Sequence, residues 1–337
     1  MKNPRAKHNF LGHPCAITGV GAYVPERILA NAELEKLVET SDEWITTRTG
    51  IKERRIAAVD EFTSSLATKA AERAMKMAGV TAGQIDLIIV ATLTPDMPFP
   101  STACLVQRNL GAARAAAFDI EAACSGFIYA LDIGQQFILS RTYETVLVVG
   151  AEKLSSIVNW KDRNTCVLFG DGAGAAILQH RENSHGLLTA VMGADGNKAD
   201  LLSMPGGGSA CPATQTSVAE GKHFLRMDGK ETFKNAVNAM VSAAHEAMRR
   251  CEIDIADIKC VIPHQANQRI VDAVGDRLKA TPEQLFINLH KYGNTSAASV
   301  AIALDEAVSS GRIERGDLIL LVVFGAGLTW GAAVIEW

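Results

Sequence analysis

Three absences narrow the class of protein. The 337-residue sequence contains no run of about 18 apolar residues, so no membrane-spanning helix is predicted. The basic N-terminal segment lacks the apolar stretch of roughly 7–15 residues that marks a secretory signal. The seven cysteines are odd in number and form no Cys-x-x-Cys pair, which argues against a disulfide framework or a zinc site. We therefore expect a soluble, cytoplasmic protein without a metal or cofactor.

Charge is also scarce. Charged residues make up 21% of the sequence, and the net charge is -4. A nucleic-acid-binding protein normally carries a basic face, so nucleic acid is not an expected partner. Hydrophobic residues reach 48%, so the chain can bury a large core, either as one α/β unit or as two packed halves.

An internal repeat favours two halves. The segments 167–178 and 322–335 are similar, and each is predicted to form a tight hairpin around a Gly-rich turn. Upstream of both, a helix, a buried strand, a helix, a short strand, a helix and a buried strand follow in the same order. In the first half these are residues 64–78, 86–92, 101–110, 116–120, 125–140 and 145–149, and in the second half residues 232–250, 257–264, 268–279, 285–287, 295–310 and 318–323.

The repeat predicts an internally duplicated α/β fold. We place the first half at residues 12–180, with an insertion at 27–62, and the second at residues 181–337, with insertion loops over about 181–230 around Pro-Gly-Gly-Gly.

Three polar motifs stand at the ends of predicted elements: Ala-Ala-Cys-Ser-Gly-Phe at 122–127, His-Gln-Ala-Asn at 264–267, and Tyr-Gly-Asn-Thr-Ser-Ala-Ala-Ser at 292–299. They contribute the Cys124 thiol, the His264 imidazole and the Asn294 carboxamide. Symmetric packing of the halves would bring these strand ends together, where α/β sheets bind ligands.

This trio suits acyl transfer. A thiol at a helix N-terminus is expected to have a pKa lowered toward thiolate, and nearby backbone amides can stabilise an oxyanion. Taken singly, Cys124 can also be a packed core cysteine, although the local sequence favours the reactive thiol, whereas a histidine such as His264 is more often a core residue. Asn294 also fits a turn or a helix cap. A papain-like hydrolase also uses Cys, His and Asn, although it does not need this duplication. A non-catalytic partner subunit is a third interpretation.

The motifs resemble those of β-ketoacyl-acyl-carrier-protein synthase III. Besides the three strings above, Thr-Ser-Asp-Glu-Trp-Ile-x-x-Arg-Thr-Gly-Ile (40–51), Phe-Gly-Asp-Gly-Ala-Gly-Ala-Ala (169–176) and Phe-Gly-Ala-Gly-Leu-Thr-Trp-Gly (324–331) match, from about Ala16 to Trp337. The resemblance implies the thiolase fold, a duplicated five-layered α/β/α/β/α arrangement, in a homodimer.

The same resemblance implies a decarboxylative Claisen condensation that starts fatty acid synthesis. Cys124 would take an acyl group, acetyl by expectation, from acyl-CoA. Malonyl-acyl carrier protein would then lose CO2 and attack the thioester, with His264 and Asn294 stabilising the enolate. The oxyanion hole for acyl transfer would be the backbone N–H groups of Cys124 and Ala326, where the family often has Gly in place of Ala326.

Further roles follow only from the resemblance. Phe99 would limit the acyl pocket across the dimer interface. A basic patch for the acidic carrier protein would consist of Lys234, Arg269 and Arg277, which serve equally well as a solvated helix face. Contacts to CoA or pantetheine would come from Trp44, Arg48, Arg163, Gly229, Phe233 and Asn267.

Related enzymes remain as alternatives. Elongating synthases use Cys-His-His, hydroxymethylglutaryl-CoA synthases Cys-His-Glu, and thiolases two cysteines with His, so Asn294 argues against these. Synthase III relatives that start polyketide or quinolone pathways share Asn294 and are the second interpretation. The strings around Trp44, Arg48 and Phe99 favour the fatty-acid enzyme.

Overall fold

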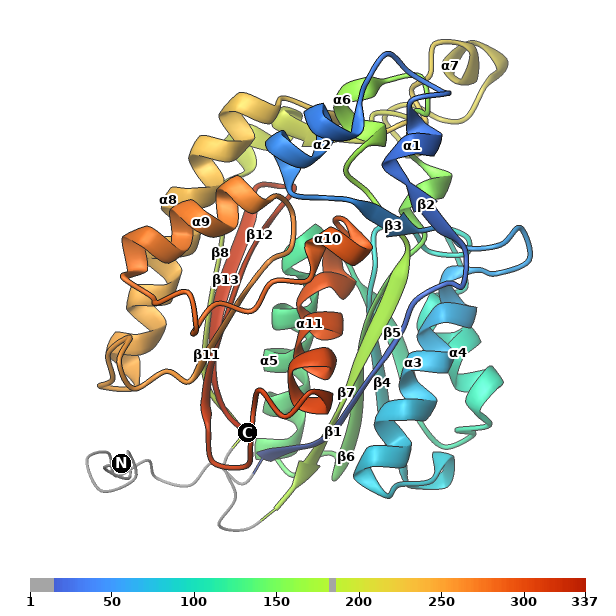
Figure 1. Cartoon of the computed structure of the whole chain (residues 1–337). Helices are drawn as coiled ribbons and strands as arrows, with labels where there is room; N and C mark the ends of the chain where they lie inside the picture. The colour runs from blue at the N-terminus through green and yellow to red at the C-terminus, as the bar shows by residue number, and fades with distance from the viewer. Residues whose placement is uncertain (1–14, 182–185) are drawn as a thin grey trace.

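The computed structural model describes residues 15–181 and 186–337, which form two large β-sheets, with helices between and outside them, and two small two-stranded sheets (Figure 1). The predicted start of the first half, residue 12, lies outside the described residues. Within these ranges no helix is long and apolar enough to cross a membrane.

The first sheet has the strand order β1-β7-β6-β4-β5. The pairs β1–β7 and β7–β6 are antiparallel, and β6–β4 and β4–β5 are parallel. Its strands are β1 (Cys15–Tyr23), β4 (Leu87–Ala91), β5 (Ala116–Ile120), β6 (Thr145–Glu152) and β7 (Gly172–His180).

The second sheet repeats this arrangement. Its order is β11-β12-β13-β8, with a parallel β11–β12 pair and antiparallel β12–β13 and β13–β8 pairs. Thus β8, β13, β12 and β11 correspond to β1, β7, β6 and β4. The strands are β8 (Leu187–Ala194), β11 (Cys260–Pro263), β12 (Leu318–Gly325) and β13 (Thr329–Glu336). The duplicated fold is confirmed.

Helices complete five layers. The central pair, α5 (Gly126–Leu139) and α11 (Ser299–Ser309), packs between the sheets, and its residues share one apolar core with both (Figure 1). A second core joins the first sheet to α3 (Thr63–Ala78) and α4 (Thr102–Leu110). A third joins the second sheet to α8 (Gly229–Arg250) and α9 (Gln268–Leu278).

Short elements lie beyond the carboxyl ends of the strands (Figure 1). The predicted insertion at 27–62 contains β2 (Ile28–Ala30), α1 (Asn31–Leu34), α2 (Asp42–Thr49) and β3 (Glu53–Arg55). The others are α6 (Arg163–Cys166), β9 (Leu202–Ser203), α7 (Gln215–Ala219), β10 (Arg226–Met227) and α10 (Leu289–Tyr292).

Three details of the predicted organisation are wrong. No hairpin begins at residue 167, because β6 pairs with β7 across a long connection that contains α6. The range 181–230 is not only loops, since it includes β8, the counterpart of β1. The short strand expected at 285–287 is reduced to one bridge between Leu285 and Val261. In each case strand pairing across the sheet, which a local pattern does not contain, decides the structure.

Candidate active site

Cys124 lies in a tight turn just before the central helix α5. The 3₁₀ turn Ala123–Ser125 holds it, and the residue is 5% exposed. Ala123 adopts a left-handed φ of 46°, and its N–H donates to Glu121 Oε1 over 2.9 Å. The thiol therefore stands at the amino end of α5, as predicted.

The hairpin between β12 and β13 closes against this turn. A Cβ on Gly325 would lie 2.7 Å from Cys124 N, so glycine is required for the approach. The Thr329 hydroxyl lies 2.9 Å from the carbonyl oxygens of both Ala122 and Ala326. These contacts fix the backbone of Cys124 relative to that of Ala326, the two residues predicted to form an oxyanion hole.

His264 follows β11 and is 3% exposed. Its N–H donates to Val322 O over 2.7 Å, which continues the pairing of β11 with β12. The ring atom Nδ1 lies 2.5 Å from Ser299 Oγ at the start of α11. Burial lowers the pKa of His264 to about 3, so the imidazole is neutral at physiological pH.

Asn294 is held by its neighbours in the turn before α11. Its backbone N–H donates to Leu168 O over 2.8 Å, and its carbonyl accepts from Gly170 N over 3.0 Å. Its side-chain Oδ1 accepts from Ser296 N over 2.9 Å. Because the oxygen is occupied by this contact, the NH2 group is the part of the amide that faces the site.

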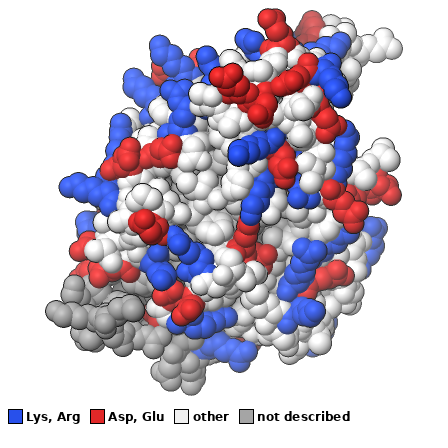
Figure 2. Space-filling model, viewed as in Figure 1, with Lys and Arg blue, Asp and Glu red and all other residues white. Residues whose placement is uncertain are grey.

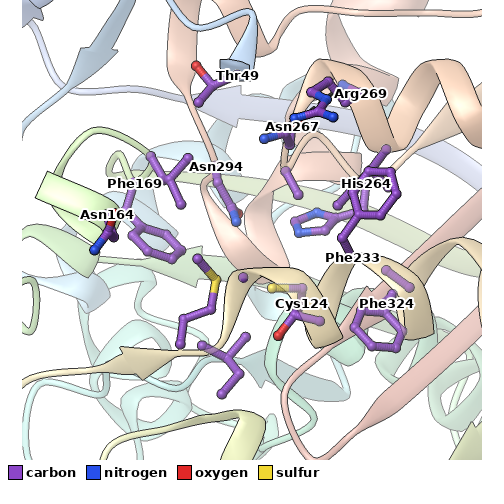
Figure 3. Close-up of a pocket in the computed structure, with 18 of the residues that line it drawn as sticks. Thr49, Cys124, Asn164, Phe169, Phe233, His264, Asn267, Arg269, Asn294 and Phe324 are labelled. Atoms are coloured by element: carbon purple, nitrogen blue, oxygen red, sulfur yellow. Dashed lines mark hydrogen bonds between the residues drawn. The ribbon is translucent and has the colours of Figure 1, made fainter. Parts of the chain in front are cut away.

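The three predicted side chains converge as expected. Figure 3 shows the Cys124 thiol, the His264 ring and the Asn294 amide pointing toward one another, from elements of both halves. All three line one cavity of about 670 Å³. The site thus lies where the carboxyl ends of strands from the two sheets meet.

The predicted thiolate is not supported by the structure of the site. Burial raises the pKa of Cys124 to about 12, and the negative charges of Glu152 and Glu121 act in the same direction. The Ser296 side chain acts in the opposite direction and offsets them only in part. The sequence shows the helix N-terminus, but it does not show how completely the thiol is removed from water. A pKa raised this far keeps the Cys124 thiol protonated at neutral pH.

A second cavity of about 390 Å³ also reaches Cys124. It is lined mainly by apolar side chains, and Ala326 lies on its wall. The apolar residues include Leu93, Leu154, Ile157, Phe169, Leu202, Met204 and Leu225. Cys124 thus stands between a larger cavity that carries the polar groups and a smaller apolar one.

Most of the predicted CoA-contacting residues line the larger cavity. These are Trp44, Arg48, Gly229, Phe233 and Asn267. Asn267 caps α9 by accepting from Arg269 N over 2.9 Å, and its amide donates to Arg48 O over 3.3 Å.

Arg163 lies outside the lining of this cavity. Its guanidinium carbon is 5.0 Å from the centre of the Trp44 ring, and that of Arg48 is 4.7 Å from the same ring. Arg163 also donates to Glu39 O over 2.9 Å. The structure therefore assembles Trp44, Arg48 and Arg163 into one stacked group.

The remaining predicted residues are exposed. Phe99 is 84% exposed and lines neither cavity, which excludes ordinary core packing within this chain. Lys234 lies on α8, and Arg269 and Arg277 lie on the neighbouring α9. Of these three, only Arg269 reaches the larger cavity.

Sequence reasoning missed four residues that shape the site. Ser299 contacts the His264 imidazole. Thr329 contacts both the Cys124 turn and the β12–β13 hairpin. Ser296 and Glu152 lie behind the thiol. Ser296 and Ser299 belong to the 292–299 motif, but the sequence alone did not predict which groups they contact. Nothing local to Glu152 distinguishes it from a surface carboxylate.

Neutral His264 leads to a direct prediction. In protein labelled with ¹³C-histidine, the His264 ring signal should keep its neutral position from pH 8 to pH 5, because a pKa of about 3 leaves the ring unprotonated above that value. Exposed His245 on α8 provides a reference signal in the same spectrum. A His264 titration centred near pH 6.5 would contradict the burial described above.

A duplicated fold that presents a buried thiol, a neutral imidazole and a carboxamide donor at one cavity defines a condensing acyltransferase. Family models agree. Residues 118–196 match 3-oxoacyl-[acyl-carrier-protein (ACP)] synthase III, and residues 248–337 match its C-terminal part.

Individual relatives extend the match over the whole chain. The β-ketoacyl-[acyl-carrier-protein] synthase III of Caldanaerobacter subterraneus is 59% identical over 321 residues, 95% of this chain and 97% of that protein. The crystal structure of the synthase III from Aquifex aeolicus has a TM-score of 0.89 and 49% identity, and the match covers 96% of this chain and all of that one. The chain belongs to the β-ketoacyl-acyl-carrier-protein synthase III family.

One similar structure is named for a polyketide pathway. The priming β-ketosynthase of the R1128 polyketide biosynthetic pathway is 36% identical, with a TM-score of 0.88 and 95% coverage of both chains. The fold is therefore shared by enzymes of more than one pathway.

Proposed function

We propose that this protein condenses an acyl-CoA with malonyl-acyl carrier protein and so starts fatty acid synthesis. The observation that carries the proposal is the position of Cys124, between a polar cavity with His264 and Asn294 and an apolar cavity. The names of the relatives supply the acyl carrier protein, and 59% identity to a synthase III against 36% to a polyketide-priming enzyme favours the fatty-acid pathway.

The first half-reaction is acylation. Cys124 Sγ attacks the thioester carbon of acyl-CoA, and the backbone N–H groups of Cys124 and Ala326 stabilise the oxyanion. The Cys124 thiol loses its proton as the S–C bond forms, and CoA leaves and is released as its thiol, so one proton is given up and one is taken up. The acyl chain occupies the apolar cavity, whose volume of about 390 Å³ accommodates acetyl and larger starters.

The second half-reaction is decarboxylative condensation. Malonyl-acyl carrier protein loses CO2, and the negative charge moves to its thioester oxygen as an enolate. In the tautomer in which Nδ1 accepts from the Ser299 hydroxyl, neutral His264 presents Nε2–H, and Asn294 presents its NH2 group. These two donors stabilise the enolate without having to release a proton. The carbanion then attacks the Cys124 thioester and yields the β-ketoacyl product.

CoA binding is assigned to the mouth of the larger cavity. The adenine would stack on Trp44, with Arg48 in the sandwich, while Arg163 pairs with the nucleotide phosphates after leaving its place over Trp44. The pantetheine arm would run past Asn267, Gly229 and Phe233.

Partner surfaces complete the proposal. Lys234, Arg269 and Arg277 on α8 and α9 would attract the acidic carrier protein, and Figure 2 shows basic side chains over this part of the surface, interspersed with acidic ones. Exposed Phe99 would enter the acyl cavity of a second subunit in a homodimer. A cytoplasmic location fits these substrates.

Replacement of Trp44 by Ala tests the CoA assignment. Loss of one stacking interaction of about 1–2 kcal/mol should raise the KM for acyl-CoA roughly 5- to 30-fold. Acyl-pantetheine, which lacks the nucleotide, is the matched control substrate, and its KM should be unchanged. Steady-state formation of β-ketoacyl-acyl carrier protein measures both. An equal rise in KM for both substrates would contradict the assignment of Trp44 to CoA binding. Absence of any β-ketoacyl product from the wild type with every acyl-CoA would contradict the proposed function.

A further inference from the structure

The two cavities that meet at Cys124 differ in charge. Arg48, Arg269 and Asp228 line the larger cavity, so two cationic side chains and one carboxylate face it. Within the described part of the chain, Glu121 is the only acidic residue in the lining of the smaller cavity, and no lysine or arginine belongs to that lining. The cavity assigned to the acyl chain is therefore apolar, with one negative charge at its wall and no cation to balance it.

Glu121 is held at the edge of the Cys124 turn. It directly follows β5, the edge strand of the first sheet, and precedes the 3₁₀ turn Ala123–Ser125. Its Oε1 accepts from Ala123 N over 2.9 Å, and Ala123 is the residue before Cys124. This hydrogen bond fixes the carboxylate next to the nucleophile, at the wall of the acyl cavity.

The Glu121 carboxylate has no cationic partner. Among the ion pairs formed within residues 15–181 and 186–337, none includes Glu121. The side chain is exposed in the single chain, so water solvates it. Its charge nevertheless reaches the thiol, since it contributes to the raised pKa of Cys124. An acyl group bound at Cys124 therefore lies within range of an uncompensated negative charge.

The proposed reaction requires two thioesters to be told apart at one thiol. Acyl-CoA must transfer its acyl group to Cys124, whereas the malonyl thioester must not, and the malonyl group differs by its terminal carboxylate. In the acyl cavity, such a carboxylate would lose water to apolar side chains, find no cation and face the charge of Glu121. In the larger cavity it would find Arg48 and Arg269.

We propose that Glu121 is a specificity-determining residue that keeps acyl groups with a terminal carboxylate out of the acyl cavity. The proposal rests on the function proposed above and extends it to the class of acyl group. Cys124 accepts uncharged acyl groups and rejects dicarboxylic ones such as malonyl and succinyl. Specificity of this kind comes from repulsion of the wrong substrate as much as from contacts to the right one.

The rejection also gives the malonyl group a direction. Its carboxylate is disfavoured on the Glu121 side of Cys124 and is left to the larger cavity, which His264 and Asn294 line. Decarboxylation then takes place beside the two enolate donors, and the acyl cavity stays occupied by the chain on Cys124.

The apolar lining by itself also disfavours a carboxylate, so its effect must be separated from that of Glu121. Glu121→Gln removes the charge and retains an oxygen that can accept from Ala123 N, so the turn is preserved. Because Glu121 is exposed, its repulsion is screened by salt over about 10 Å at 0.1 M ionic strength, whereas the cost of desolvation is not.

Acylation of Cys124 by butyryl-CoA and by succinyl-CoA tests the proposal. The two acyl chains have the same length and differ by a terminal methyl group against a carboxylate. Intact-protein mass spectrometry gives the initial rate with each donor, and the succinyl-to-butyryl ratio is the measure. Glu121→Gln should raise this ratio about 5- to 10-fold at low salt, the size expected for repulsion between hydrated charges. Glu121→Lys, which supplies a cation, should raise it further.

Glu144→Gln is the matched control. Glu144 is an exposed residue before β6, at the end of the first sheet opposite to the site, and its replacement changes the net charge by the same amount. This variant should keep the wild-type ratio. Raising the salt concentration from about 0.05 M to about 0.5 M should bring the ratios of the wild type and Glu121→Gln closer together.

The outcomes distinguish this proposal from the function on which it rests. An unchanged ratio in Glu121→Gln, or an equal rise in Glu144→Gln, would overturn the role of Glu121. A rise in Glu121→Gln that salt does not affect would show an effect of shape rather than charge and would overturn it as well. Absence of a Cys124 adduct from both acetyl-CoA and butyryl-CoA in the wild type would instead reject the proposed function.

Discussion

Cys124→Ser should abolish the acyl adduct and reduce condensation by about 10⁴-fold or more. A serine hydroxyl in the same buried turn is a much weaker nucleophile than a thiol, and removal of the nucleophile from a cooperating set of residues has effects of this size. The measurement is the rate of CoA release in the presence of malonyl-acyl carrier protein.

Cys104→Ser is the matched control for this variant. Cys104 is an exposed cysteine on α4 and lines neither cavity, so its replacement should leave the rate unchanged. Retention of an acyl adduct in Cys124→Ser, or its transfer to another of the seven cysteines, would show that the nucleophile has been assigned wrongly.

Asn294→Asp should reduce decarboxylation of malonyl-acyl carrier protein by about 10²–10³-fold while Cys124 is still acylated. The variant retains the oxygen that accepts from Ser296 N, so the turn is preserved. It replaces the NH2 donor by an oxygen, which removes one of the two hydrogen bonds to the enolate. Release of ¹⁴CO2 measures the second half-reaction, and intact mass measures the first.

His264→Ala provides the parallel test. It removes the other enolate donor and should cause a loss of similar size in CO2 release. Because the two residues act on the same oxygen, the losses should not add fully in the double variant. Loss of acylation with decarboxylation retained, in a variant of either residue, would contradict the assignment of His264 and Asn294 to the second half-reaction.

The clustering of Cys124, His264 and Asn294 was predictable because each residue lies in a short motif at the end of a regular element. The duplicated order of helices and strands then placed Cys124, His264 and Asn294 at one interface, and the structure brings them together (Figure 3). The central and outer helices were also found, to within a few residues, from their apolar periodicity.

What the sequence did not reveal depends on burial and on partners distant in the chain. The pKa of Cys124 was predicted with the wrong sign because burial of the thiol outweighs the effect of the helix N-terminus. Glu152 looks like a surface residue in the sequence, yet strand pairing with β7 buries it completely. The hairpin expected at 167–178 is absent because β7 pairs with β6, from which it is separated by a long connection.

The roles assigned to Arg163 and Phe99 require CoA and a second subunit. Arg163 stacks on Trp44 here, and its predicted pairing with phosphates requires it to move. Phe99 is exposed, and its predicted role as a gate requires a second subunit. These residues were suggested by resemblance alone, whereas the trio also follows from the geometry of the fold.

The central claim is that Cys124 carries the acyl group between the two half-reactions. Intact-protein mass spectrometry after incubation with a panel of acyl-CoAs tests it most directly. We expect one acyl adduct, mapped to Cys124, that persists in buffer and disappears when malonyl-acyl carrier protein is added, with β-ketoacyl-acyl carrier protein as the product. An adduct that hydrolyses in buffer at the same rate with or without the malonyl acceptor would contradict the account and indicate a thioester hydrolase.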